Sequence, residues 1–219
     1  MVPGSTSALY SVPSQEGNVL VKNAQGGLAQ GFSMVEVFVT ITIIGITTAI
    51  ALVAFTNQLP TIRADAAMQL MEAQLRQARE TAVDQRDNIV VTFQGTGEMI
   101  TVEDLKNSNA ATYTIIGTKT LSDFILDPRQ MTYMLFAGLP DTPDGFGNLT
   151  AVSFNCGNPP LPCNITFQSD GSVVDRTGAY VNGTVFIGNS GDTVTARAIT
   201  ILGATGRIKG YRYKTNAWF

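Results

Sequence analysis

A single carboxylate stands at the border of the most apolar segment of the chain. Glu36 is followed by an uncharged block, and the next basic residue after it is Arg63. A carboxylate inside the apolar part of a membrane span costs about 2.5–3.5 kcal/mol, so it needs a cationic partner. A cut between Gly31 and Phe32 would supply one, because the new α-amine is cationic at neutral pH and lies four residues before Glu36. These residues therefore point to proteolysis that creates the missing charge.

A second candidate site is a run of cations and aromatic residues near the C-terminus. Its members are Arg207, Lys209, Tyr211, Arg212, Tyr213 and Lys214, and no acidic residue follows Arg197. In a strand, Arg207 and Lys209 would share one face, and the other two cations would share the opposite face. Such cations neutralise phosphates without reading sequence, and tyrosines can stack on exposed bases. DNA is therefore a candidate partner, but the plainer interpretation is a solvated edge strand whose charges prevent aggregation.

Two cysteines, Cys156 and Cys163, flank a short proline-rich segment and could close it as a disulfide, which would indicate an oxidising compartment. The alternative is two free thiols, because spacing alone does not prove pairing. The chain has no histidine, so the thiols make a poor zinc site and the usual hydrolase triads are excluded. Asp141 and Asp144 lack calcium-loop spacing and read as a turn. We expect no metal, no cofactor and no enzymatic activity.

Two helical segments are expected to position the first site. Residues 37–55 carry no charge, and at ~1.5 Å per residue they would be about as long as a bilayer's hydrocarbon core is thick. We therefore predict a transmembrane helix over 32–56. An amphipathic helix is predicted over 61–86, with one apolar face that consists of Ala67, Met71, Leu75, Ala78 and Ala82. Pro60 lies between the two segments and is the natural place for a bend.

The remainder of the chain, residues 88–219, has short β-rich runs separated by turn residues. The runs are expected at 89–93, 99–102, 113–116, 131–136, 152–154, 165–167, 185–187, 194–202 and 208–213. A long helix followed by many short strands predicts an α+β protein whose C-terminal domain is an antiparallel sheet. We therefore expect three parts: a leader at 1–31, a helix at 32–86 and a β-rich globular domain at 88–219.

The residues from Gly31 to Glu36, followed at once by an apolar, isoleucine-rich helix, resemble the class III signal of type IV prepilins and type II secretion pseudopilins. The resemblance implies that a membrane prepilin peptidase cuts after Gly31 and N-methylates Phe32. It also implies that Glu36 pairs with the N-terminal amine of a neighbouring subunit during assembly.

Three further segments narrow the resemblance. The helical run Ala67–Ala82 leading into 89–93 is similar to the GspH/FimT-like branch of minor pilins and pseudopilins, as are the runs Asn164–Gly171 and Ala198–Lys209. That branch implies a minor subunit of a type IV pilus or a type II secretion pseudopilus, acting in filament assembly with other pilins. It also implies a single-pass protein of the bacterial inner membrane with a periplasmic C-terminal domain. Some FimT-like members bind DNA for uptake, which is the alternative function. Residues 94–163 resemble nothing in that branch.

Overall fold

The computed structural model describes residues 31–95, 99–104, 114–121, 131–156 and 162–219. The expected leader up to residue 30 lies outside the described residues. The chain separates into two compact units, residues 1–48 and 49–219. One helix, α1 (Met34–Gln85), begins in the first unit and ends in the second.

Helix α1 continues through Pro60 without interruption, so the two expected helical segments are parts of one helix. Its threonines are accommodated because their hydroxyls donate to carbonyls of the preceding turn, as Thr42 does to Phe38 at 2.8 Å. The helix ends where Arg86 adopts a left-handed conformation with φ 54°. The amide of Asp87 then donates to the Ala82 carbonyl at 3.2 Å, which satisfies an orphan carbonyl of the last turn.

The N-terminal part of α1 exposes its apolar side chains. Residues Met34–Thr56 have a mean hydropathy of 2.4 and none of this segment is buried. Phe38, for example, is 61% exposed and Ile44 is also 61% exposed. Among the described residues, this is the one helix long and apolar enough to cross a membrane, judged by length and composition.

The second unit contains two antiparallel sheets of five strands each. The first sheet has the order β3 (Thr114–Thr120), β2 (Met99–Asp104), β1 (Ile89–Gln94), β5 (Cys163–Phe167) and β6 (Val173–Val174). The second has the order β10 (Ala217–Trp218), β9 (Arg207–Lys214), β8 (Asp192–Leu202), β7 (Gly183–Asn189) and β4 (Thr132–Tyr133). All neighbouring strands pair antiparallel. The predicted α+β class, a long helix followed by antiparallel sheet, is confirmed.

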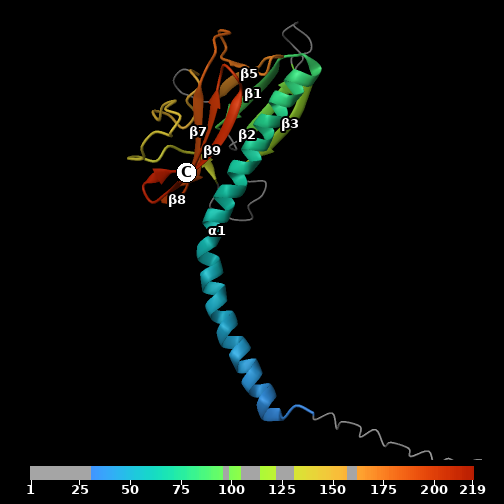
Figure 1. The fold of residues 1–219 in the computed structure, drawn as a ribbon, viewed down its shortest axis with the longest axis vertical. Helices are drawn as coiled ribbons and strands as arrows, with labels where there is room; N and C mark the ends of the chain where they lie inside the picture. Colours follow the sequence, from blue (N-terminus) through green and yellow to red (C-terminus); the bar gives the residue numbers. More distant parts are fainter. Residues whose placement is uncertain (1–30, 96–98, 105–113, 122–130, 157–161) are drawn as a thin grey trace, which may run out of the picture. The chain divides into compact units, whose positions relative to one another are not determined.

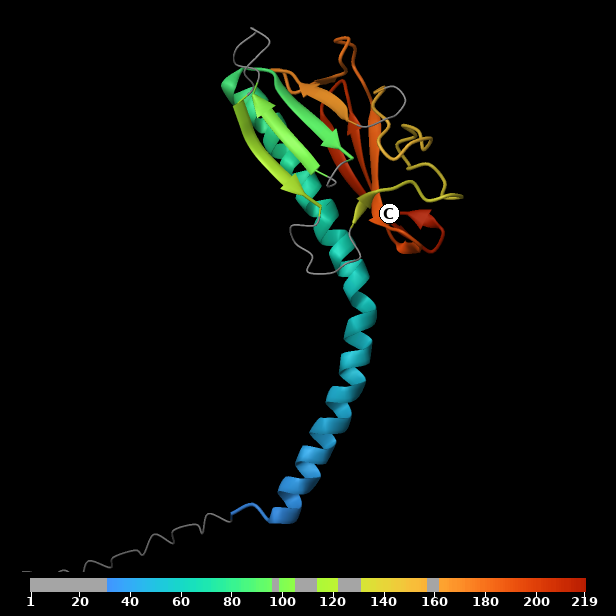
Figure 2. The ribbon, with the colours of Figure 1, turned by 180° about the vertical axis from the view of Figure 1, so that it is seen from behind.

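The C-terminal part of α1 lies along the sheets, as both opposite views show (Figures 1 and 2). The predicted apolar face is buried there, since Met71, Leu75, Ala78 and Ala82 are 0% exposed and Ala67 is 4% exposed. These side chains share one core with strand residues of both sheets, including Val91, Ile165, Ile199 and Ile201. Burial of this face is therefore what holds the helix to the sheets.

A second, smaller core covers the outer face of the second sheet. It contains Phe136, Phe186, Ala196, Ala198, Tyr211 and Trp218. The indole nitrogen of Trp218 donates to the Pro140 carbonyl at 2.8 Å, which ties the last strand to the segment after β4. That segment is mostly irregular: the run expected at 131–136 forms only the two-residue β4, and the run at 152–154 forms one bridge, from Val152 to Val185. Strands β6 and β10 were not expected from the sequence.

Candidate assembly segment and basic strand

Residues Gly31 to Ser33 precede α1 as irregular, exposed chain, and Phe32 is 81% exposed. The Ser33 carbonyl accepts from the Val37 amide at 3.1 Å, so the helix begins immediately after this segment. The expected cut between Gly31 and Phe32 thus falls in accessible backbone outside the helix. Proteases require an extended, accessible segment of this kind.

Glu36 lies in the first turn of α1, where it is exposed and makes no ion pair with any described residue. Its carboxylate there interacts favourably with the helix macrodipole by about 0.3–1 kcal/mol. This gain is smaller than the ~2.5–3.5 kcal/mol that a carboxylate costs inside a bilayer. If this segment lies in a bilayer, the helix dipole alone does not account for an acidic residue at its border, and Glu36 needs a cation from outside the described residues.

The four C-terminal cations all lie on β9 and all four are exposed. Lys209 shares a face with Tyr211 and lies over its ring, 4.5 Å from the centroid. The opposite face turns toward α1, since the Nε of Arg212 lies 3.0 Å from the Asp65 carboxylate of the helix. The cations are therefore divided between two faces, as the alternation along a strand predicts.

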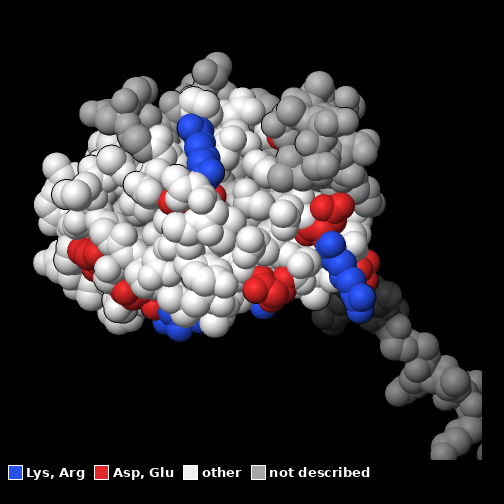
Figure 3. Space-filling view, turned by 90° about the horizontal axis from the view of Figure 1, so that it is seen from above, with Lys and Arg blue, Asp and Glu red and all other residues white. Residues whose placement is uncertain are grey.

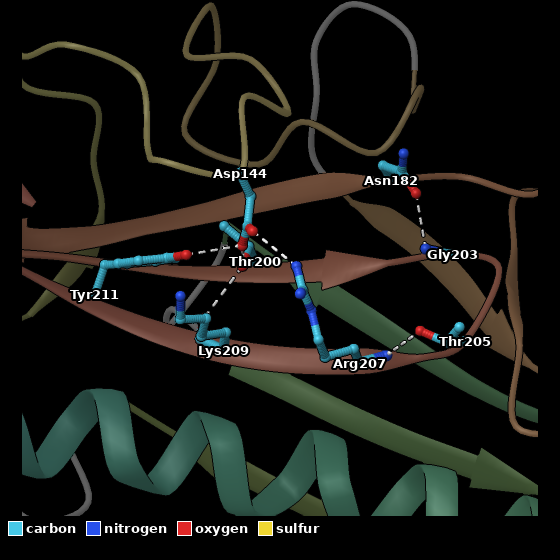
Figure 4. A network of polar contacts seen from close by, with 8 residues as sticks. All are labelled: Asp144, Asn182, Thr200, Gly203, Thr205, Arg207, Lys209 and Tyr211. Atoms are coloured by element: carbon cyan, nitrogen blue, oxygen red, sulfur yellow. Dashed lines mark hydrogen bonds and ion pairs between the residues drawn. The ribbon is translucent and has the colours of Figure 1, made fainter. Parts of the chain in front are cut away.

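Asp144, from the segment after β4, reaches onto β8 and β9 and binds three of their side chains (Figure 4). Its carboxylate accepts from the Thr200 hydroxyl at 2.6 Å, the Tyr211 hydroxyl at 3.0 Å and Arg207 Nη2 at 2.7 Å. Burial raises the pKa of this carboxyl, but the hydrogen bonds from Thr200 and Tyr211 and the charges of Arg207 and Lys209 outweigh burial, so the net pKa is below its usual value. Asp144 therefore holds the irregular segment on the sheet and neutralises part of the basic strand.

We predict that Asp144→Asn lowers the free energy of unfolding by about 1–2 kcal/mol at pH 7, because charge-assisted hydrogen bonds become neutral ones. The depressed pKa of Asp144 means that its contribution is present above the unfolded pKa, near 4, and is lost as pH falls through the lower folded pKa. The difference in thermal unfolding between the two proteins should therefore be largest at pH 7 and shrink as the pH falls from about 4 through the folded pKa. A difference that stays constant over this acid range would contradict this role.

Tyr211 does not lie on an accessible surface. It is 3% exposed and its hydroxyl is bound by Asp144, so the expectation that it stacks on bases is wrong. Tyr213 packs edge-on against Trp218 with ring centroids 5.1 Å apart, which makes it part of the smaller core's border. On the face seen in Figure 3, basic side chains are scattered among acidic ones and form no continuous basic surface over the described residues. The charges in the sequence alone could not reveal that these cations are partly neutralised, because their acidic partners come from distant segments.

Arg197, counted with the C-terminal cations by sequence, is buried beneath α1 at 2% exposure. Its Nε lies 2.7 Å from the Asp65 carboxylate, and its terminal nitrogens donate to the carbonyls of Thr61, Val194 and Ala196. Because Arg212 binds the same carboxylate, one acidic side chain of the helix joins two strands of the second sheet. Sequence reasoning missed this cluster, because a single aspartate on a helix carries no signal.

The structure joins Cys156 and Cys163 in a disulfide with a Cα–Cα distance of 5.2 Å; of the residues between them, 157–161 lie outside the described ones. Contacts on either side of the disulfide hold it to the segment after β6. Asn155 Nδ2 donates to Asp175 at 2.9 Å, and Arg176 Nη2 donates to the Pro162 carbonyl at 3.0 Å. Hydrogen bonds from Thr177 and Asn155 lower the pKa of Asp175 to about 2, so it is ionised at neutral pH. The disulfide and these hydrogen bonds therefore have a structural role.

Within the described ranges, no group of three or more potential metal-binding side chains comes together. Asp141, one of the two aspartates of the expected turn, accepts from the amides of Thr142 and Gly147 at 2.7 and 2.9 Å. The turn closes where the Gly145 amide donates to the Thr142 carbonyl at 2.9 Å, with φ 69° at the glycine. Its carboxylates are thus engaged in forming the turn and holding it to the sheet.

No family model and no curated protein matches the chain. Among solved structures, it is similar to the type IV minor pilin FimU of Pseudomonas aeruginosa, with 17% identity and a TM-score of 0.43 over 71% of this chain and 96% of that one. A second crystal form of FimU has 16% identity and a TM-score of 0.41, over 71% and 91%. The minor pseudopilin EpsH of the Type 2 Secretion System of Vibrio cholerae has 14% identity and a TM-score of 0.44, over 68% and 97%. At such scores, function has to be inferred from this chain's own residues.

Proposed function

We propose that this chain is a minor pilin or pseudopilin: a non-enzymatic subunit that is processed at the membrane and packs with other pilins into a filament. The observation that carries the proposal is the joint placement of Gly31, Phe32 and Glu36. An accessible candidate cut site, a carboxylate in the first helical turn and an uncharged, fully exposed helix follow one another directly. No single one of these features is specific. In combination, the cut would create a cationic amine, that amine would pair with the carboxylate, and the exposed helix would pack against neighbouring helices.

The proposed mechanism begins with prepilin peptidase, which cleaves after Gly31 and methylates the new N-terminal amine of Phe32. The methylated amine keeps its positive charge at neutral pH. In a filament, the amine of one subunit then pairs with Glu36 of its neighbour. Such a charge-assisted contact in an apolar environment sets the axial register, because any other register leaves both charges unpaired.

The proposed location is the bacterial inner membrane, crossed once by the helical segment 34–56, with the two-sheet unit in the periplasm. The apolar side chains of this segment are exposed along its length, including Ile41 at 60% and Leu52 at 63%. Such a helix is stable either in lipid or against similar helices. The disulfide between Cys156 and Cys163 agrees with an oxidising compartment.

Incorporation into filaments tests this proposal directly. Cells that express an epitope-tagged chain should release it with sheared filaments when prepilin peptidase is active, and should retain it in the membrane when the peptidase is deleted. A chain that stays in the membrane fraction in both strains, beside filaments that form normally, would contradict the proposal. Whether the filament belongs to a pilus or to a secretion pseudopilus would follow from which major subunit co-purifies.

A second candidate function, weak capture of DNA, is favoured by the exposure of all four cations on β9. We expect the full chain in neutral detergent to retard a single-stranded oligonucleotide only at low salt. Neutralising four phosphates on a single strand corresponds to a salt slope of about −3. Replacing Arg207, Lys209, Arg212 and Lys214 with alanine should abolish the shift. No retardation at low salt, or a shift that survives all four substitutions, would rule out this site.

A further inference from the structure

A cleft lies between α1 and the turn that joins β8 to β9, on the opposite side of β9 from the Asp144 network. It has a volume of about 430 Å³ and is lined by Arg76, Arg79 and Glu80 of the helix and by residues 205–208 of the turn. Of the three arginines in this lining, Arg76 and Arg79 come from the helix, whereas the guanidinium of Arg207 pairs with Asp144 on the other face of β9. Nothing in the proposed filament mechanism uses them.

Arg79 is the fixed part of this cleft. Its side chain is half-buried against two glycine turns, Gly171 and Gly206, which have φ angles of 81° and 60°. A Cβ on Gly206 would clash with the Gly171 carbonyl oxygen and lie 2.9 Å from Arg79 Nε, and one on Gly171 would lie 3.2 Å from both Nε and Nη2, so the guanidinium packs directly on the two turns. Nε donates to the Gly171 carbonyl at 3.3 Å. The guanidinium is therefore held in place at one nitrogen.

The remaining donors of Arg79 are available. Among the described residues, its two terminal nitrogens make no hydrogen bond or ion pair, whereas Arg76 is paired with Glu72 at 2.7 Å and Arg207 with Asp144 at 2.7 Å. A guanidinium with two parallel N–H donors matches a carboxylate or a phosphate in a bidentate manner. The neighbouring Arg76 raises the local positive potential although it has an acidic partner.

Glu80 sets an upper limit on the charge that the cleft accepts. It is exposed and lines the same cavity, so it repels a chain of phosphates that passes across the opening. The cleft therefore has one pre-positioned guanidinium with free donors, one partly neutralised guanidinium and one opposing carboxylate. This balance suits one singly charged oxyanion better than a polyanion.

We propose that this cleft binds a single carboxylate presented by a neighbouring protein chain, as an acidic side chain or a chain terminus, and that Arg79 is the residue that grips it. The proposal rests on the proposed function, because a filament subunit has other subunits beside its globular unit. It adds to that function a lateral contact between globular units, in addition to packing of the apolar helices.

The test uses the full chain in dodecyl maltoside, labelled with ¹⁵N-arginine so that side-chain Nε–H signals report directly. The probe is a capped pentapeptide with one glutamate, and the matched control is the same peptide with glutamine. We expect the glutamate peptide to shift the Arg79 signal saturably and the glutamine peptide to leave it in place. Sodium phosphate and a single-stranded decanucleotide are titrated separately.

Three variants sharpen the test. Arg79→Gln should weaken glutamate-peptide binding at least tenfold, since a charge-assisted bidentate pair is lost. Glu80→Gln removes the opposing charge without touching the packed stem, so it should tighten binding several-fold. Arg176→Gln, which removes the same charge from an exposed site elsewhere, should change nothing.

Three results would overturn the proposal. The first is equal response to both peptides, and the second is unchanged peptide binding in Arg79→Gln together with unchanged binding in Glu80→Gln. The third is an Arg79 signal that responds to phosphate or oligonucleotide and not to the glutamate peptide, which would reassign the partner. Processing at Gly31 does not involve this cleft. A chain that is processed but fails these tests would therefore refute the carboxylate site alone, and an unprocessed chain would refute the proposed function alone.

Discussion

Replacing Glu36 with alanine is expected to lower recovery of the chain in sheared filaments at least tenfold. The reason is the loss of one charge-assisted pair worth about 1.5–3 kcal/mol per subunit, and 1.4 kcal/mol corresponds to a factor of ten. The substitution also removes a carboxylate from the membrane boundary, so the precursor should insert in the membrane at least as well as the wild type. Quantitative immunoblotting of sheared and membrane fractions measures both effects.

Two comparisons make this result specific. Glu36→Gln keeps the size of the side chain and removes the charge, so it should behave like the alanine variant. Asp84→Ala removes an exposed carboxylate near the other end of the same helix and should incorporate normally. The variant must also retain its folded globular unit, which thermal unfolding reports. Incorporation of Glu36→Gln at the wild-type level would remove Glu36 from the assembly mechanism.

Replacing Asp65 with alanine should lower the free energy of unfolding by about 3–5 kcal/mol, the range found when one partner of a buried ion pair is removed. Arg197 would keep its backbone contacts but would hold an uncompensated charge at 2% exposure. Arg212 would lose the same partner. Because the Asp65 contact joins the helix to β8 and β9, we also expect hydrogen exchange along the C-terminal part of α1 to accelerate.

The double variant Asp65→Leu with Arg197→Met separates charge from packing. If the deficit of the alanine variant arises from an unpaired buried cation, removing both charges should recover most of the lost stability. Arg76→Ala serves as the surface control, since its pair with Glu72 is 56% exposed on the arginine side and should contribute less than about 0.5 kcal/mol. Chemical denaturation of the four proteins measures these differences. Equal stability of Asp65→Ala and Arg76→Ala would refute the role of the buried pair.

Periodic patterns allowed much of the fold to be predicted. The apolar face of α1 was identified from its spacing because a helix repeats every 3.6 residues, and the structure buries every member of it. The longer strands were predicted for a similar reason: β1 and β8 are rich in β-branched residues, β9 contains one isoleucine and two tyrosines, and turn residues separate such runs. This approach overestimated the length of β4. An apolar run such as 131–136 can instead supply side chains to the smaller core from irregular backbone.

Pro60 shows a different limit of prediction from local sequence preference. The ring removes one backbone donor and disfavours helix in the preceding turn, so a bend was a reasonable expectation. The structure continues the helix through this position, which lies between an exposed apolar segment and the buried face that begins at Ala64. Helical stability from tertiary packing on one side therefore outweighs the local preference of a single residue.

The two candidate sites also differ in how far the sequence alone could predict them. The cut site and Glu36 are adjacent in sequence, so their spacing could be evaluated without a structure. The partners of the basic strand could not be found this way, because Asp144 is 63 residues before Arg207 and Asp65 is 132 residues before Arg197. Those contacts add to the expected division of the β9 cations between two faces that Arg207 and Arg212 are each paired with an acidic side chain.

The central claim is that the chain is cut after Gly31 and that the new amine belongs to the assembly mechanism with Glu36. Intact-mass and N-terminal peptide mass spectrometry of the membrane-purified protein tests it most directly. We expect a mature chain that begins at Phe32 and carries one additional methyl group on its α-amine. A chain that keeps its leader in cells with active prepilin peptidase would contradict the claim.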